Sequence, residues 1–174
     1  MAALSPEYTE ILRRELSTQY VPHLPPLLPT NLVQPPEKQI NRALSAFAIH
    51  TLFGVSAQVA SKAVIDDFQD NGIDAIYYQT ETETLHLFQS KFKSSEDFKQ
   101  EEAQDFCVGV KLLLNKAFTA FNQNVVDREV EIRGALGEID FIQLWVVYTG
   151  SGVTGTAKTR FQQLFEDDSH GEGG

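Results

Sequence analysis

Two short apolar segments separated by a polar turn constrain the fold of this chain most. Residues 73–78 and 85–92 are rich in apolar and aromatic side chains, whereas residues 79–84 between them contain neither a large apolar side chain nor a glycine. Apolar segments of this length on either side of a polar turn are typical of a β-hairpin. We therefore expect two antiparallel strands here.

The periodicity of a strand places three polar groups on one face of this hairpin. Successive side chains alternate between faces, so Gln89 and Lys91 share one face of the second strand. If the turn is centred between Glu81 and Thr82, every even loop length places Asp74 opposite Gln89, with Cβ atoms about 4.5–5.5 Å apart. Asp74 and Gln89 would then hold one cation between them, with Lys91 one pleat further on. An odd loop length would separate these groups.

The hairpin and the loop before it resemble a known family of nucleases. An aspartate, a hairpin and Gln-x-Lys are similar to the PD-(D/E)xK nuclease superfamily, in the Mrr-like variant in which Gln replaces the middle acid. Residues 65–77 and 88–92 resemble more closely the N-terminal nuclease domain of AIPR (abortive phage infection) proteins, whose pattern is Asp–loop–Asp-x-Gly-Ile-Asp-Ala-Ile-Tyr and Gln-Ser-Lys-Tyr. The resemblance is specific over residues 56–93. Phe68 departs from it, because the family usually has a glycine there.

The resemblance implies both a fold and an activity. The fold would be α/β, with a restriction-endonuclease-like core whose mixed central sheet is flanked by helices, plus an N-terminal helical extension. The activity would be a Mg²⁺-dependent endonuclease that hydrolyses DNA in anti-phage defence. Asp74, Gln89 and the main-chain carbonyl of Ser90 would bind Mg²⁺ or Mn²⁺, since hard cations prefer oxygen ligands. Lys91 would position the attacking water or stabilise charge on the phosphate.

Three acids outside the hairpin are candidates for the same site. Many of these nucleases carry a metal-binding Glu on the helix before the hairpin, and Glu37 is the matching candidate. The alternative that we favour is an acid that stabilises the helix N-terminus. Asp67 and Asp70 lie in the loop before the hairpin. They would either stabilise the conformation of this loop or contact the metal ligands without binding the metal. For Asp70 the first role is favoured.

The net charge argues against tight DNA binding by this chain alone. The 174 residues carry a formal net charge of −10, whereas DNA binding needs clustered Lys and Arg side chains. Lys93 and Lys99, which follow the hairpin, are the nearest candidates for nucleic-acid contacts. A homo-oligomer or a further C-terminal region would have to supply additional contacts with DNA.

Composition predicts a soluble cytoplasmic protein. No run of 18 apolar residues and no signal-like segment is present, so no membrane partner is expected. The single cysteine, Cys107, excludes an internal disulfide framework and a Cys-type zinc site. Its apolar neighbours predict a buried, inert thiol.

Helical periodicity and capping residues predict the order of the elements. We expect an N-terminal helix and Pro-rich connector over residues 1–36, a nuclease-like domain over 37–166, and a flexible acidic, Gly-rich tail over 167–174. The expected helices lie at about 4–20, 36–53, 56–65, 94–121 and 157–165, with a buried central strand at 141–148 and a connection at 125–137.

Other functions stay open at this point. One is a non-catalytic module of the same fold that binds a partner, which the acidic balance favours, and another is an RNase. Residues 150–155 also fit G-x-G-x-x-G after a strand. The chain ends before the second strand that would carry a ribose-binding acid, so a tight glycine turn is favoured over a dinucleotide site.

Overall fold

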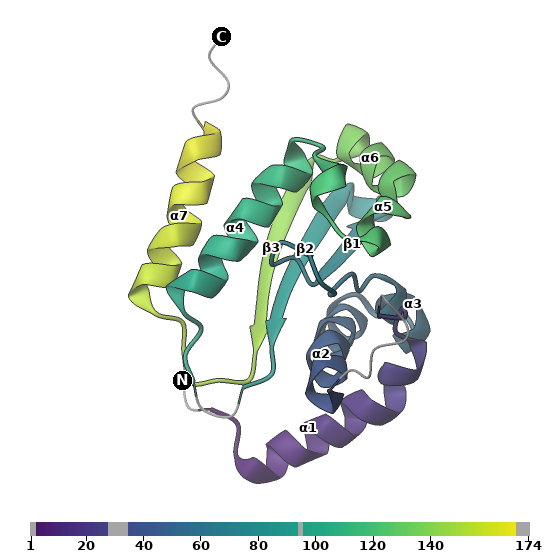
Figure 1. The fold of residues 1–174 in the computed structure, drawn as a ribbon, viewed down its shortest axis with the longest axis vertical. Helices are drawn as coiled ribbons and strands as arrows, with labels where there is room; N and C mark the ends of the chain where they lie inside the picture. Colours follow the sequence, from purple (N-terminus) through teal and green to yellow (C-terminus); the bar gives the residue numbers. More distant parts are fainter. Residues whose placement is uncertain (1–2, 28–34, 94–95, 170–174) are drawn as a thin grey trace.

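A computed structural model describes residues 3–27, 35–93 and 96–169 of the chain. Within these residues the protein has a mixed α/β fold, in which helices flank a three-stranded sheet (Figure 1). The α-helices are α1 (Pro6–Gln19), α2 (Pro36–Phe53), α3 (Ala57–Lys62), α4 (Gln100–Leu114), α5 (Gln123–Val126), α6 (Glu129–Glu138) and α7 (Gly155–Ser169). The strands are β1 (Ala75–Gln79), β2 (Thr84–Lys91) and β3 (Phe141–Tyr148), and short 3-10 helices lie at η1 (Val21–His23), η2 (Thr80–Thr82) and η3 (Phe118–Ala120).

The predicted hairpin register is confirmed along the paired strands. β1 and β2 are antiparallel, with Tyr78 opposite Leu85 and Ile76 opposite Leu87. The regular ladder begins at Ala75, and the preceding Asp74 donates its backbone N–H to the carbonyl of Phe88 at 2.7 Å. The 3-10 turn η2 therefore joins the strands without the register shift that would have separated the two polar faces.

The position predicted for strand 141–148 within the sheet is wrong. The order is β1-β2-β3, with β3 parallel to β2, so β2 is the central strand and β3 lies at an edge. Every residue of β2 except Lys91 is buried, whereas Phe141 on β3 is 64% exposed. The apolar run of β3 arises because helices cover both faces of the sheet, and coverage of faces does not determine a strand's rank within it.

Two apolar cores lie on the two faces of the sheet. On one face, Ile76 and Leu87 pack with residues of α4, α6 and α7. On the other face, Ala75 and Phe88 pack with residues of α1, α2 and α3. Figure 1 shows α4 crossing the sheet beside α7, with α2 and α1 at the end of the sheet where β1 begins. The first helix thus shares a core with α2.

Helix α4 is shorter than the sequence predicts. Its first turn is closed by the Lys99 N–H, which donates to a carboxylate oxygen of Glu102 at 2.8 Å. Ser94 and Ser95, at the start of the helix predicted over 94–121, lie outside the described residues. The chain leaves the helix at Lys116, whose φ of 57° lies in the left-handed region, instead of continuing to Phe121.

The C-terminal third is more helical than expected. Residues 125–137 were predicted as a connection, yet most of them belong to α6. The sequence of α6 shows little apolar periodicity, because Ile132 and Ala135 are its only buried residues. α7 extends to Ser169, beyond the predicted start of the tail, and residues 170–174 lie outside the described part of the chain. No described helix combines the length and apolar character needed to cross a membrane.

The glycine-rich segment 150–155 packs closely against the chain before α4 through backbone hydrogen bonds. The Phe98 N–H donates to the Gly152 carbonyl at 2.8 Å, and the Thr154 N–H donates to the Phe98 carbonyl at 3.0 Å. A Cβ atom at Gly150 would lie 1.9 Å from the carbonyl oxygen of Glu96. This close approach gives the glycine a structural reason, as expected for the favoured glycine turn.

Candidate metal centre

A polar cavity lies at the end of the sheet where β1 begins and β2 ends. Its volume is about 270 Å³, and its walls come from α2, the loop before β1, the end of β2 and the first turns of α4. Five carboxylates and two ammonium groups line it: Asp66, Asp70, Asp74, Glu102, Asp105, Lys38 and Lys91. A cavity with this excess of negative oxygen atoms favours a cation as its occupant.

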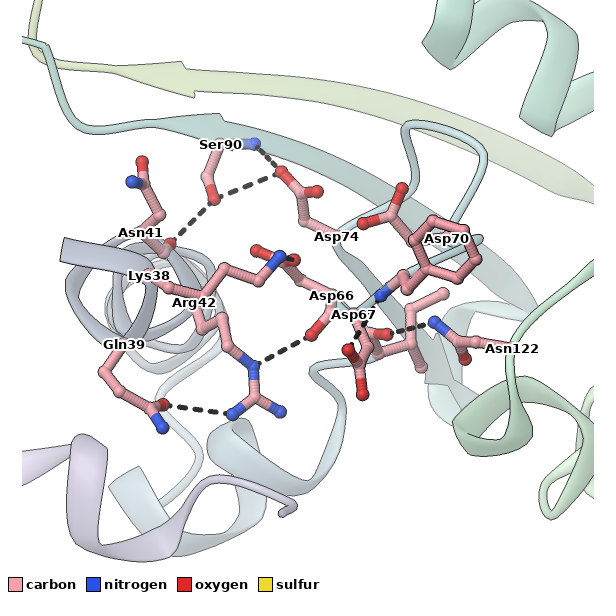
Figure 2. Close-up of polar contacts among 12 residues, drawn as sticks. Lys38, Gln39, Asn41, Arg42, Asp66, Asp67, Asp70, Asp74, Ser90 and Asn122 are labelled. Carbon is pink, nitrogen blue, oxygen red and sulfur yellow. Dashed lines mark hydrogen bonds and ion pairs between the residues drawn. The ribbon is translucent and has the colours of Figure 1, made fainter. Parts of the chain in front are cut away.

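The loop over residues 65–74 curls back on its own ends. The backbone N–H groups of Ile65 and Asp66 both donate to the carbonyl of Asp74, at 2.8 and 3.0 Å. The Asp70 carboxylate accepts the Gly72 N–H at 2.8 Å, as in an Asx turn. Asn122 donates its side-chain amide to the carbonyl of Ile65 at 2.8 Å and so ties the loop to the segment after η3. These bonds bring Asp66, Asp70 and Asp74 close together (Figure 2).

Two glycines allow the loop to lie directly against α4. Gly72 has a φ of +74°, and a Cβ atom there would lie 2.7 Å from the backbone of Asp105 and Phe106. On the helix, a Cβ atom at Gly109 would lie 2.1 Å from the carbonyl oxygen of Asn71. α4 can therefore form one wall of the cavity only because both surfaces lack a side chain at the contact.

Three carboxylates and one amide provide a set of oxygen atoms suited to a hard cation. One oxygen from each of Asp66, Asp70 and Asp74 lies within 4.8 Å of the other two. Gln89 lines the same cavity, is 2% exposed, and its Oε1 has no hydrogen-bond partner among the described residues. A buried oxygen without a donor is costly, and cation binding would compensate that cost. The amide is therefore an observation independent of the acids that indicates a ligand.

Asp74 is anchored by the residue that follows Gln89. Its Oδ2 accepts the Ser90 backbone N–H at 2.5 Å and lies 3.3 Å from the Ser90 hydroxyl. That hydroxyl also lies 3.0 Å from the carbonyl of Asn41 and accepts from Ser45 at 2.8 Å. Figure 2 shows this chain of contacts from α2 across to Asp74. The second oxygen of Asp74 accepts none of these bonds.

Burial and the charge of neighbouring acids shift Asp70 and Asp74 toward their protonated forms. Burial, followed by the charges of Asp66 and Asp70, raises the pKa of Asp74 well above its usual value. Burial and the charge of Asp66 raise the pKa of Asp70 to about 6. Lys91 opposes both shifts. A bound cation would stabilise the charged forms in the same way, and more strongly.

The structure brings most of the predicted site residues together. Asp74, Gln89, Ser90 and Lys91 all line the cavity, and Asp70 lines it while also bracing the loop. Asp67 does not line it, and its carboxylate accepts the Phe68 N–H at 2.7 Å, which braces the loop locally.

Glu37 lies apart from these residues. Nη1 of Arg13 on α1 donates to both of its carboxylate oxygens, at 2.7 and 2.9 Å, and its side chain is 64% exposed. It does not line the cavity, and the next residue, Lys38, does. The position fits the favoured alternative of an acid in the first turn of α2.

The two lysines predicted to bind nucleic acid have acidic neighbours. Lys93 pairs with Glu102 at 2.7 Å and lies 3.9 Å from Glu96. Lys99 also lies 3.9 Å from Glu96, and its side chain is 56% exposed. These acidic neighbours partly neutralise Lys93 and Lys99, so both lysines would attract a phosphate group less strongly.

Sequence reasoning missed several residues of the cavity. Asp66 was part of the matched loop but was not predicted as a ligand, although Asp66, Asp70 and Asp74 recur at intervals of four. Lys38, Asn41, Glu102 and Asp105 were also missed. No local pattern marks them, because they enter the cavity through the packing of α2 and α4 around the loop.

These features describe a mixed α/β protein with an acidic, cation-type cavity at one end of its sheet. The chain matches no protein-family model, no curated protein and no solved structure. The resemblance to AIPR and PD-(D/E)xK nucleases therefore stays a prediction.

Proposed function

We propose that this protein is a metal-dependent nuclease that hydrolyses phosphodiester bonds of DNA, with a restriction-endonuclease-like core related to the AIPR and Mrr-like groups and a role in phage defence. One observation carries the proposal: one oxygen from each of Asp66, Asp70 and Asp74 lies within 4.8 Å of the other two, in a cavity that Lys91 and Gln89, whose Oε1 has no partner among the described residues, also line. This combination of oxygen ligands and a cationic side chain suits the hydrolysis of a phosphate ester.

The donor set fits Mg²⁺ or Mn²⁺ because every candidate ligand is an oxygen atom. Asp74, Gln89, Asp66 and Asp70 would hold the ion. When bound, such an ion polarises the phosphate and lowers the pKa of a water molecule. Lys91 would donate hydrogen bonds to the attacking water or to the phosphate oxygens, and Ser90 keeps Asp74 oriented through its N–H.

A second candidate is a non-catalytic module of the same fold that binds a cation or a partner without hydrolysis. The ion pair between Lys93 and Glu102 favours this second candidate, because the pair reduces the positive charge beside the cavity. RNA is an alternative substrate, because the candidate metal ligands and Lys91 would act on the phosphodiester group that DNA and RNA share.

Cleavage assays with matched substitutions test the proposal. Supercoiled DNA and single-stranded RNA are incubated with the parent protein, Asp74→Asn and Lys91→Met in Mg²⁺ and in EDTA. We expect each substitution to lower the cleavage rate by about 100-fold or more, the typical cost of losing a group that stabilises the transition state. EDTA should abolish cleavage.

Two surface substitutions of the same types serve as controls. Asp127→Asn and Lys62→Met change exposed residues outside the cavity and should leave the rate unchanged. Cleavage by Asp74→Asn at the parent rate would refute the nuclease proposal. Cation binding by the parent without cleavage of either nucleic acid would favour the non-catalytic module.

A further inference from the structure

Lys38 places its own positive charge at the carboxylates of the cavity. It lies in the first turn of α2, and its ammonium forms an ion pair with Asp66 (Figure 2). The Asp66 side chain is 7% exposed and that of Lys38 is 33% exposed, so the pair reaches inward from the rim of the cavity. The ammonium thus contacts the carboxylate of Asp66, one of the three acids grouped for a cation.

The backbone of Asp66 is held without help from Lys38. Its N–H donates to the Asp74 carbonyl at 3.0 Å, and its carbonyl accepts from Arg42 Nε at 2.9 Å. Arg42 is fully buried and also donates to the Pro25 carbonyl at 2.7 Å. Because these bonds already position Asp66, the ammonium of Lys38 serves chiefly to balance its charge.

The two lysines of the cavity are arranged differently around the acids. Lys38 pairs with Asp66 on the α2 side, while Lys91 lies at the end of β2 on the face that also carries Gln89. A divalent cation held by Asp66, Asp70 and Asp74 would carry the same sign of charge as Lys38 and would bind to the same carboxylate. Two positive charges on one carboxylate in a poorly solvated site repel each other.

We propose that Lys38 is an internal counter-ion of Asp66 with which a divalent cation must compete when it binds. Because this competition presupposes the metal centre proposed above, the charge of Lys38 sets the cation affinity of that centre. Removing its charge should tighten binding of the cation, whereas removing a ligand should weaken it.

Calorimetric titration with Mn²⁺ at neutral pH measures this competition directly. The variant Lys38→Met keeps a long side chain but removes the charge, and a thioether is a poor ligand for a hard cation. We expect Lys38→Met to bind Mn²⁺ about tenfold more tightly than the parent, a typical effect of one hydrogen bond to a charged group. Lys62→Met makes the same change on α3, outside the cavity, and should leave the dissociation constant within about twofold, as expected of a screened surface charge.

A double-mutant cycle with Asp66→Asn separates the pair from a general charge effect. Asp66→Asn alone should weaken Mn²⁺ binding. In the Asp66→Asn background, Lys38→Met should give less than half of the gain, on a logarithmic scale, that it gives in the parent. An equal gain in both backgrounds would show that Lys38 acts through the overall charge and would overturn the proposed pairing.

Two further outcomes are distinguishable. If the parent binds Mn²⁺ and Lys38→Met binds it equally or more weakly, the counter-ion role is refuted and the metal centre stands. If neither protein binds Mn²⁺ while both give the same cooperative unfolding transition, the metal centre and the role of Lys38 are both refuted.

Discussion

Asp70 illustrates how a single residue of the cavity lowers the stability of the protein without a cation. Its carboxyl has a pKa of about 6 in the folded chain against 3.8 for the ordinary group. At Asp70 the folded state therefore binds more protons than the unfolded state between these values, so the contribution of Asp70 to the free energy of unfolding falls as the pH rises from about 4 to about 6, by linkage. Above that range the loss is complete.

The variant Asp70→Asn tests this cost. The amide oxygen can still accept the Gly72 N–H, but the charge is gone. At pH 8 in EDTA we expect the free energy of unfolding to exceed that of the parent by about 1–3 kcal/mol, since each pKa unit corresponds to about 1.4 kcal/mol. At pH 4 the two proteins should be nearly equal, because Asp70 is then largely protonated in the folded parent.

Urea unfolding at both pH values measures the difference. Asp127→Asn is the matched control, because Asp127 is exposed on the surface and accepts a bond from Gln123 at 2.6 Å that an asparagine oxygen can also accept. A gain for Asp70→Asn that is equal at pH 4 and pH 8 would contradict the assignment of the effect to charge.

At the scale of elements, the contact between the 65–74 loop and α4 determines whether the cavity exists. α4 contributes Glu102 and Asp105 to the walls, and it reaches the loop because Gly109 leaves room for the carbonyl of Asn71. A methyl group at this position has no space unless the loop or the helix moves. The geometry of the aspartates is therefore coupled to one glycine of a helix that carries no predicted site residue.

Alanine substitutions at two helical glycines test this coupling. Gly109→Ala should lower the free energy of unfolding by about 1–3 kcal/mol, as expected for overpacking, and should weaken Mn²⁺ binding. Gly134→Ala in α6, where no atom lies within 4 Å of an added Cβ, should raise it by about 0.5–1 kcal/mol, since alanine favours a helix more than glycine does. Urea unfolding that shows stabilisation by both substitutions would contradict the close contact.

At the scale of the whole molecule, charge limits what the cavity can hold. The chain carries a formal net charge of −10, and Lys93 near the cavity is paired with Glu102. The field of such a protein repels a polyanion except where a bound cation and a few lysines meet it. Few phosphates would then be neutralised on binding.

Salt-dependent binding of DNA measures this effect. We expect Asp74→Asn to bind a fluorescent 20-base-pair duplex weakly at 150 mM salt, with log Kd changing by only about 2–4 units per tenfold change in salt, as for two to four phosphate contacts. Anisotropy titrations between 50 and 200 mM NaCl provide the slope. Nanomolar binding with a slope beyond about 6 would contradict this limit, because it requires many more phosphate contacts.

Local periodicity was enough to predict the features that depend on neighbouring residues. The hairpin register followed from the alternation of side chains and an even turn, and it placed Asp74, Gln89 and Lys91 at one cavity. The helices predicted at about 4–20 and 56–65 start within two residues of α1 and α3, where the hydroxyls of Ser5 and Ser56 accept backbone N–H groups of the first turn. Each of these features depends on residues close together in the chain, or on a turn whose length can be counted.

The packing of helices and loops determines which distant residues complete the cavity. Lys38 instead of Glu37 faces the aspartates, because the orientation of α2 is fixed by its packing on the sheet and on α1. Glu102 and Asp105 enter through the contact of Gly72 and Gly109, and β2 instead of β3 is the central strand. Such features arise from the packing of elements that are far apart in the sequence. The periodicity of a sequence identifies the apolar face of a helix or strand, but it does not identify the element against which that face packs.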